Sequence, residues 1–475
     1  MNDGNTNTTR RRSPVGRAAA FVRLSLRDND EDYTKGRINR ALGLLAIPMM
    51  LEMSMESVFA IVDIAFVSRL GTDAIAAVGI TEALVTVLYA IAVGLGMGVT
   101  AMVSRRIGAA EHEAAARVTG QAIWVGAGLS LLIGVPGAFY AADMLSLMGA
   151  SDSVIETGTG FAAVLLGGSA SIIYLFLLNA AFRGAGDASV ALRSLWLANG
   201  INIVLDPCLI FGLGPFPEMG VTGAAVATTI GRGIGVLYQL WYLFDGRGRL
   251  RFRVRNLALA PRVLARMLVI SAGGVGQFLI STSSWIIIMR IVALYGSTAV
   301  AAYTVALRIF EFIWLPSWGL GNAAATLVGQ NLGAGKPERA VVSTWLAAKY
   351  NTIFMILIGI VLATFAPAIA GFFSSDPEVL RYGTSCLRIL AVGIPMYAVG
   401  MIVTQAINGS GDTTTPTIIN FICFWVLQIP LAYWLAASVS LGPDGVFWAI
   451  VVSETLVTVL SVIIFRRGKW QHRTA

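Results

Sequence analysis

GLGMGVTAMVSRRIGA, residues 94–109, returns 225 residues later as GLGNAAATLVGQNLGA, residues 319–334. The same offset pairs further glycines along the chain: Gly71 with Gly296, Gly158 with Gly383, and Gly220 with Gly445. A match of this length in one ungapped register is not expected by chance. The chain therefore contains two copies of one unit.

Both copies are strongly apolar. Of the 475 residues, 56% are hydrophobic and 13% are charged, and the mean hydropathy is +0.75. Soluble domains carry roughly 25% charged residues, and one membrane span needs about 20 apolar residues. Twelve apolar runs fit this length: 41–68, 75–103, 118–140, 156–182, 194–213, 221–244, 267–294, 299–327, 344–372, 382–407, 417–437 and 445–465.

Six spans in each copy give the architecture. Because six is even, both copies insert the same way up and are related by an axis along the membrane normal. We expect an all-α integral membrane protein of twelve transmembrane helices. The two parallel six-helix repeats would form an N-lobe and a C-lobe around a central cleft.

The basic residues predict the orientation. With the twelve runs above, 27 of the 34 Lys and Arg residues fall on one side, where both termini lie. The positive-inside rule makes that side cytoplasmic, in a multi-pass plasma (inner) membrane protein. We expect a flexible cytoplasmic tail at 1–37, the N-lobe at 38–244, a basic linker at 245–266, the C-lobe at 267–466 and a tail at 467–475. The net charge of +8 reflects this bias and does not indicate nucleic-acid binding.

The sequence contains no motif typical of an enzyme or of nucleotide binding. Its three cysteines, Cys208, Cys386 and Cys423, lie in apolar runs without a metal-binding spacing. We therefore expect no catalysis and no cofactor, and any transport would be driven by an ion gradient.

The first predicted helix carries three carboxylates, at Glu52, Glu56 and Asp63, with Pro48 one turn earlier as a candidate kink. At 100° per residue, Glu56 and Asp63 lie about 40° and 20° from Glu52, so the three share one stripe. Charged groups inside a membrane are costly and mark functional sites. We expect Glu52 and Glu56 to face the substrate cavity.

The fifth predicted helix has its own polar stripe of Asn199, Asn202 and Asp206, and the sixth contributes Thr228. We expect Asn199 at the cavity. Carboxylate, amide and hydroxyl oxygens suit a hard cation or a proton, with Na⁺ as one candidate. The alternative is a set of hydrogen bonds that only holds the helices together.

The second copy lacks this stripe. The positions 225 residues beyond Asp63, Asn202 and Asp206 are apolar, namely Ile288, Leu427 and Leu431. This half instead places Arg308 and Glu311 three residues apart, which favours a structural or gating ion pair. We therefore expect ion coupling in the first copy.

The sequence resembles the multidrug and toxic compound extrusion (MATE) family over residues 38–466. The matching pieces are Pro48 with Val62-Asp63 and Leu70-Gly71, Phe182 to Asp187, Asn202 to Pro207, Gly223 to Thr228, and Val328 to Ala334. The resemblance implies export of organic, often cationic, xenobiotics in exchange for H⁺ or Na⁺ by alternating access.

Within that family, the branch coupling through its N-lobe uses an ion site that Asp63, Asn202, Asp206 and Thr228 match. NorM-like coupling uses two C-lobe carboxylates, and Ser281 and Tyr397 stand at those positions here. The chain is thus more similar to the DinF-like branch, and we expect it to act as a monomer. The alternatives are a polysaccharide or lipid-precursor flippase of related families and a lipid-modifying membrane enzyme.

Overall fold

The computed structural model describes residues 14–28, 31–374 and 376–472, and within them it is helical, without a strand. The first half forms α1 (Pro14–Ser25), α2 (Ile38–Val67), η1 (Ser68–Leu70), α3 (Thr72–Gly108), α4 (His112–Phe139), α5 (Ala141–Leu147), α6 (Asp152–Gly167), α7 (Ser169–Ala185), α8 (Ala188–Phe211) and α9 (Val221–Asp245). After η2 (Val254–Leu257), the second half forms α10 (Pro261–Ala293), α11 (Ser297–Gly333), α12 (Pro337–Phe373), α13 (Pro377–Gly409), α14 (Thr414–Asn420), η3 (Phe421–Gln428), α15 (Ile429–Tyr433), η4 (Trp434–Ser438), α16 (Pro443–Arg466) and η5 (Lys469–His472).

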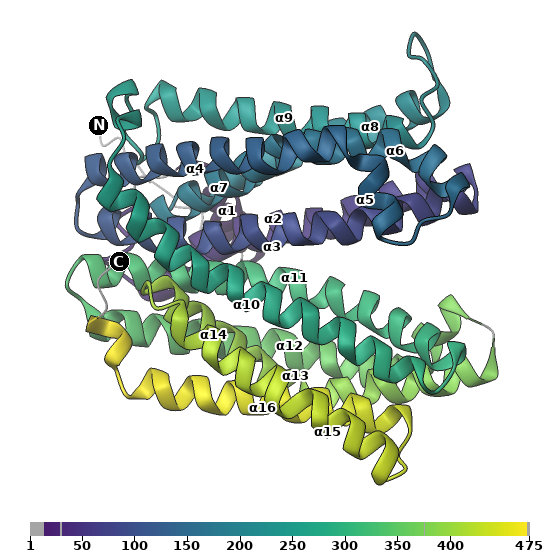
Figure 1. Cartoon of the computed structure of the whole chain (residues 1–475). Helices are drawn as coiled ribbons and strands as arrows, with labels where there is room; N and C mark the ends of the chain where they lie inside the picture. Colours follow the sequence, from purple (N-terminus) through teal and green to yellow (C-terminus); the bar gives the residue numbers. More distant parts are fainter. Residues whose placement is uncertain (1–13, 29–30, 375, 473–475) are drawn as a thin grey trace, which may run out of the picture.

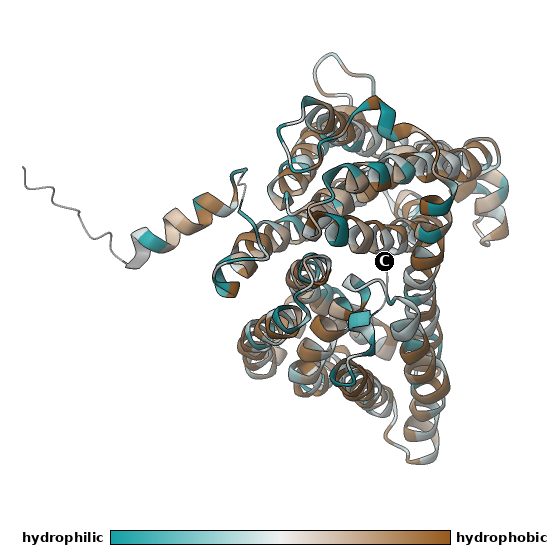
Figure 2. Ribbon diagram, turned by 90° about the vertical axis from the view of Figure 1, so that its left-hand side faces the viewer, coloured by the Kyte–Doolittle hydropathy of each residue, from teal (hydrophilic) through white to brown (hydrophobic). Residues whose placement is uncertain are grey.

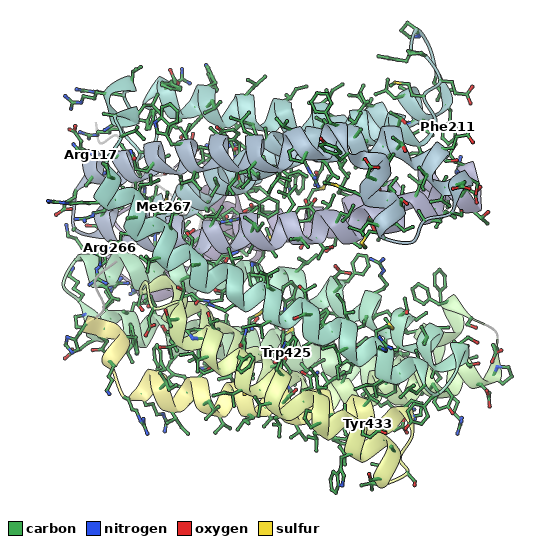
Figure 3. All side chains as sticks on the ribbon, viewed as in Figure 1. Arg117, Phe211, Arg266, Met267, Trp425 and Tyr433 are labelled. Atoms are coloured by element: carbon green, nitrogen blue, oxygen red, sulfur yellow. The ribbon has the colours of Figure 1, made fainter. Side chains whose placement is uncertain are left out.

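These helices form two lobes that lie side by side, with α2 to α9 in one and α10 to α16 in the other (Figure 1). Arg117 and Arg266 lie at the same end of the bundle as η5, whereas Phe211 and Tyr433 lie toward the other end (Figure 3). We call the end with Arg117 and Arg266 the basic end. The ribbons of the two lobes are closest there and diverge toward the other end.

A helix stands at each of the twelve apolar runs. Among the described residues, eleven helical segments are long and apolar enough to span a membrane. The twelfth, α9, has 25 residues and contains the buried Arg232. The helices consist mainly of hydrophobic residues (Figure 2). Large apolar side chains such as Leu131, Leu132 and Phe139 are exposed, as a lipid-facing surface requires.

The duplication is visible in pairs of close helix contacts. A Cβ added at Gly108 of α3 would lie 1.9 Å from the backbone oxygen of Gln330 on α11. A Cβ added at Gly333 of α11 would lie 2.0 Å from the backbone oxygen of Arg105 on α3. The 225-residue offset pairs Gly108 with Gly333 and Arg105 with Gln330, so the two contacts are equivalent in the repeat. The pseudo-two-fold axis therefore runs between α3 and α11 at the basic end.

Glycines also join the first helix of each repeat to the other lobe. A Cβ at Gly319 of α11 would lie 2.5 Å from the backbone oxygen of Met49 on α2. A Cβ at Gly94 of α3 would lie 2.3 Å from the backbone nitrogen of Val275 on α10. Only glycine permits such close approach of two backbones in a membrane bundle. The glycines of the sequence repeat thus allow the backbones of the two lobes to approach closely.

Hydrogen bonds close the basic end between the lobes. Thr326 Oγ1 donates to the backbone oxygen of Arg183 at 3.1 Å, and Gln330 Nε2 donates to that of Gly184 at 3.0 Å. Arg105 Nη1 donates to the backbone oxygen of Ser410 at 3.4 Å. Backbone and side chains together therefore seal the lobes at this end.

The expected flexible tail, 1–37, contains ordered parts. Its Arg10-Arg11-Arg12 run lies outside the described residues, whereas Phe21 of α1 packs on Gly43 of α2. The segment 31–37 contacts both lobes: Tyr33 Oη donates to the backbone oxygen of Gly186 in the N-lobe, and Lys336 Nζ of the C-lobe donates to that of Thr34. The tail therefore bridges the two halves at the basic end.

Candidate functional site

A cavity of about 580 Å³ lies between the lobes. It is lined by α2, α3, α7, α8 and α9 on one side and by α10, α11 and α13 on the other. This volume falls in the range of pockets that hold drug-sized molecules. The cavity is the central cleft that the sequence predicted.

Glu52, Glu56 and Asp63 all line this cavity from one side of α2. Glu52 is fully buried and pairs with Arg183, Nη1 to Oε1 at 2.8 Å. Glu56 accepts a hydrogen bond from Asn199 Nδ2 at 3.3 Å. Asn199 itself lies behind the wall at 1% exposure and does not line the cavity. Asn199 therefore contacts the cavity carboxylate of Glu56 instead of lining the cavity itself.

Arg232 of α9 holds Glu56 from the other side. The guanidinium is 5% exposed and lies 3.7 Å from Glu56, Nη2 to Oε1. It also lies over the rings of Phe59 and Tyr89, at 5.7 and 5.5 Å from the centroids. Cation–π contacts of this kind stabilise a desolvated cation. Glu56 is thus fixed by one amide and one guanidinium.

Removing Arg183 is expected to destabilise the protein strongly, because Glu52 would remain buried with only the neutral Asn179 Nδ2 as a donor. Breaking a buried ion pair costs about 3–5 kcal/mol, so the melting temperature of Arg183→Leu in detergent should fall markedly. Glu52→Gln combined with Arg183→Leu should recover most of the loss. The control is Arg255→Leu, whose pair with Glu113 is more than half exposed on both sides and is worth under about 1 kcal/mol. Equal losses for the two arginines would contradict a special role for the buried pair.

The predicted ion-site residues lie together behind the cavity wall. Asn202 Nδ2 donates to Asp206 Oδ1 at 3.2 Å and to Thr228 Oγ1 at 2.9 Å. Asp206 is fully buried, and its carboxylate interacts electrostatically with that of Asp63. Asp63 is the member that also lines the cavity. Asn202, Asp206 and Thr228 of α8 and α9 are thus joined by hydrogen bonds, whereas Asp63 of α2 is linked to them through its charge alone.

Three buried oxygens of this cluster lack a donor among the described residues: Asp63 Oδ1, Asn202 Oδ1 and Asp206 Oδ2. Buried acceptors without partners are costly, so the cluster suits a bound proton or a small hard cation. No group of three or more His, Cys, Asp or Glu side chains among the described residues forms a metal site. The donor set fits a monovalent ion better than a transition metal.

The C-lobe wall of the cavity is aromatic and carries the predicted ion pair. Arg308 and Glu311 lie 3.6 Å apart, Nη1 to Oε2, and both line the cavity. Beside them, Trp318 packs against Trp314 and Phe278 at centroid distances of 4.7 and 5.5 Å. The pair that the sequence predicts is confirmed, and it faces the cavity rather than the lobe interior.

Three cavity residues were missed by the sequence reasoning as site residues: Glu82, Arg183 and Arg232. Glu82 and Arg232 stand inside predicted apolar runs, so their charge alone was a usable signal. Arg183 lies at a predicted helix end, where an arginine is ordinary. Only its contact with Glu52 across the bundle distinguishes it.

Comparisons with known proteins agree with this geometry. The sequence model of the MatE family matches residues 48–208 and 275–434, once in each lobe. The "Probable multidrug resistance protein NorM" of Thermotoga maritima is 26% identical over 92% of this chain and 94% of its own. The "FAD transporter" of Shewanella oneidensis is 26% identical over 90% of this chain and 95% of its own length. A solved structure described as the outward-facing conformation of a multidrug resistance MATE family transporter superposes with a TM-score of 0.87 at 26% identity, covering 93% of this chain and 98% of that one.

Proposed function

Because the chain belongs to the MatE family of multi-pass membrane transporters, we propose that it couples export of organic compounds to entry of H⁺ or Na⁺ through its N-lobe. The protein is a multidrug efflux antiporter of alternating access and not an enzyme. The residues proposed to bind the substrate and the ion are those of the cavity and of the buried polar cluster.

One observation carries the assignment: Asp63 lines the cavity, and its carboxylate interacts electrostatically with that of Asp206 in the buried cluster. An ion bound by Asp63, Asn202, Asp206 and Thr228 would change the charge and the hydrogen bonds of α2. The same helix presents Glu52 and Glu56 to the substrate. Ion and substrate would therefore compete through one helix, which is the requirement for antiport.

Coupling through the N-lobe is the DinF-like rather than the NorM-like arrangement. Ser281 and Tyr397 offer no carboxylate at the two C-lobe positions of the NorM-like branch. The buried oxygens without donors in the N-lobe cluster support the same assignment. Pro48, inside α2 one turn before Glu52, is the proposed point at which the helix bends during the cycle.

We assign the basic end to the cytoplasm of a plasma or inner membrane, with both termini on that side. The clustering of arginines there supports this orientation. With the basic end sealed by α3 and α11, the cavity would open outward and would release substrate there. Cavity and ion cluster both lie within one chain, which supports a functional monomer.

The cavity favours cationic aromatic substrates. Its lining contains five carboxylates, Glu52, Glu56, Asp63, Glu82 and Glu311, against three arginines, Arg183, Arg232 and Arg308. Each arginine is paired with one of these carboxylates. The facing tryptophans provide stacking surfaces for planar cations. A flippase of anionic lipid precursors is not favoured by this lining or by the multidrug relatives.

Counterflow in proteoliposomes tests both assignments. Purified protein should transport a fluorescent organic cation when a pH gradient or a Na⁺ gradient is imposed alone, and the gradient that drives it identifies the coupling ion. Empty liposomes and liposomes without either gradient are the controls. Transport that proceeds equally with neither gradient would contradict ion coupling.

A further inference from the structure

The segment 31–37, which we call the N-terminal strap, crosses the basic end just before α2 begins at Ile38. The C-lobe holds the strap through two cationic side chains at the start of α12, Lys336 and Arg339, which donate to its backbone oxygens. The bonds are Lys336 Nζ to Thr34 at 2.9 Å, and Arg339 Nη1 to Gly36 at 2.9 Å, Nη2 to Lys35 at 2.8 Å and Nη2 to Tyr33 at 3.3 Å. Hydrogen bonds from a charged donor are about twice as strong as neutral ones.

The N-lobe holds the same strap through Tyr33. This side chain is 2% exposed, and its hydroxyl donates to the backbone oxygen of Gly186 at 3.4 Å. Its ring packs so closely on Gly186 that a Cβ added there would lie 2.7 Å from Cε2. The guanidinium of Arg249 lies over the ring, 4.4 Å from the centroid, and the backbone nitrogen of Arg249 donates to Asp187 Oδ2 at 2.8 Å. Tyr33 therefore anchors the strap beside the end of α7.

The two attachments differ in how easily they can break. Arg339 binds oxygens of Lys35 and Gly36, which are exposed, so water can replace these bonds. Withdrawing Tyr33 would instead bring a buried aromatic ring into water, which is more costly. The strap is also continuous with α2 of the N-lobe. If the lobes part at the basic end, we therefore expect the strap to remain with the N-lobe and to leave the C-lobe.

The second repeat contains an equivalent arrangement. The 225-residue offset pairs the strap with residues 256–262, at the end of the linker and the start of α10. Here Trp124 Nε1 and Gln121 Nε2 of α4 donate to the backbone oxygens of Leu257 and Ala258, at 2.7 and 3.0 Å. In each repeat, the segment before the first helix is thus bound through its backbone to the third long helix of the opposite lobe. The linker joins the lobes covalently, whereas the strap reaches the C-lobe through contacts that can break.

We propose that the N-terminal strap is a latch, which Lys336 and Arg339 hold closed and which stabilises the state sealed at the basic end. Opening that end requires both cations to release the strap. The bonds exist in the closed state only, so their strength sets the fraction of molecules that are open toward the basic end. The latch acts on alternating access itself, and it does not depend on which ion drives transport or on which residues bind that ion.

Thiol labelling from the basic end tests the latch in the full-length protein. The reporter is Asn322→Cys in the wall of the central cavity, with the three native cysteines replaced by alanine. Inside-out vesicles present the basic end to an impermeant maleimide, and the test needs neither substrate nor ion gradient. Arg339→Leu with Lys336→Leu should raise the labelling rate about tenfold, because the closed state loses its charged hydrogen bonds. Lys349→Leu, exposed on the same helix, is the matched control and should leave the rate unchanged.

A reversible cross-link guards against misfolding. In the cysteine-free protein without the reporter, Lys35→Cys and Arg339→Cys place thiols at two residues that are in contact across the latch. Joining them with a bifunctional methanethiosulfonate should stop efflux of a fluorescent cation, because the basic end cannot open, and a reductant should restore it. An unchanged labelling rate in the double leucine variant would overturn the proposal. Efflux at the full rate with the strap cross-linked to α12 would overturn it as well.

Discussion

Asp63→Asn is expected to abolish gradient-driven efflux while the protein still inserts and folds. Asparagine has nearly the volume of aspartate, but it carries no charge and takes up no proton. Asp63 lines the cavity and interacts electrostatically with Asp206, so we expect ion binding to reach the substrate side through it. Without it, imposed H⁺ or Na⁺ gradients should leave the export rate at the level of empty liposomes.

Accumulation of a fluorescent cation in proteoliposomes measures this loss. Asp73→Asn is the matched control, because Asp73 is exposed in the first turn of α3 and lies outside the cavity. The variant should keep the wild-type rate. Substrate binding by Asp63→Asn, measured without a gradient, should persist, since Glu52 and Glu56 remain in the cavity. Wild-type efflux by Asp63→Asn would place coupling elsewhere.

Gly108→Leu is expected to prevent the basic end from closing and so to stop transport. A Cβ at this position would lie 1.9 Å from the backbone oxygen of Gln330, and such contacts are essentially absent from real structures below 3.0 Å. Because the obstacle is backbone, α3 and α11 must move apart. The hydrogen bonds from Thr326 and Gln330 to α7 would then break as well.

Two measurements separate a blocked gate from a misfolded protein. Efflux by Gly108→Leu should be lost, and a cysteine introduced at Asn322 in the cavity should become reactive toward an impermeant thiol reagent added at the basic end. Gly79→Leu is the control, because Gly79 lies on the same helix with nothing within 4 Å of an added Cβ. Efflux at the wild-type rate by Gly108→Leu would show that this contact is dispensable for alternating access.

Most of the fold could be predicted from the sequence, because its signals are local. Hydrophobic runs of membrane-spanning length must become helices, since no other backbone arrangement in a bundle satisfies the peptide groups in lipid. The paired glycines indicated the duplication, and the structure places pairs such as Gly108 and Gly333 at equivalent contacts between the lobes. The positions of Asp63, Asn202 and Asp206 on two helical faces likewise followed from periodicity.

The site could be predicted only in part. Helical periodicity places a carboxylate on a face, but it does not say what the facing helix offers. Glu52 therefore looked like a free cavity carboxylate, whereas the structure pairs it with Arg183 of α7. The apolar residues at Ile288, Leu427 and Leu431 suggested a C-lobe without a counterpart of the N-lobe ion stripe. The π-helical segment η3 ends at Gln428, one residue away from the position that the repeat offset indicates, and Gln428 lines a small C-lobe cavity together with Glu454.

The sequence by itself determined the membrane class, the two repeats, the arrangement of basic residues and the helix faces that carry charge. Each of these depends on residues near one another along the chain or on a fixed offset between the halves. Only the tertiary structure decided which charged groups are paired and which buried oxygens are left without a donor. Those outcomes depend on distances of a few ångströms between helices far apart in sequence, and Coulomb and hydrogen-bond energies change steeply over such distances.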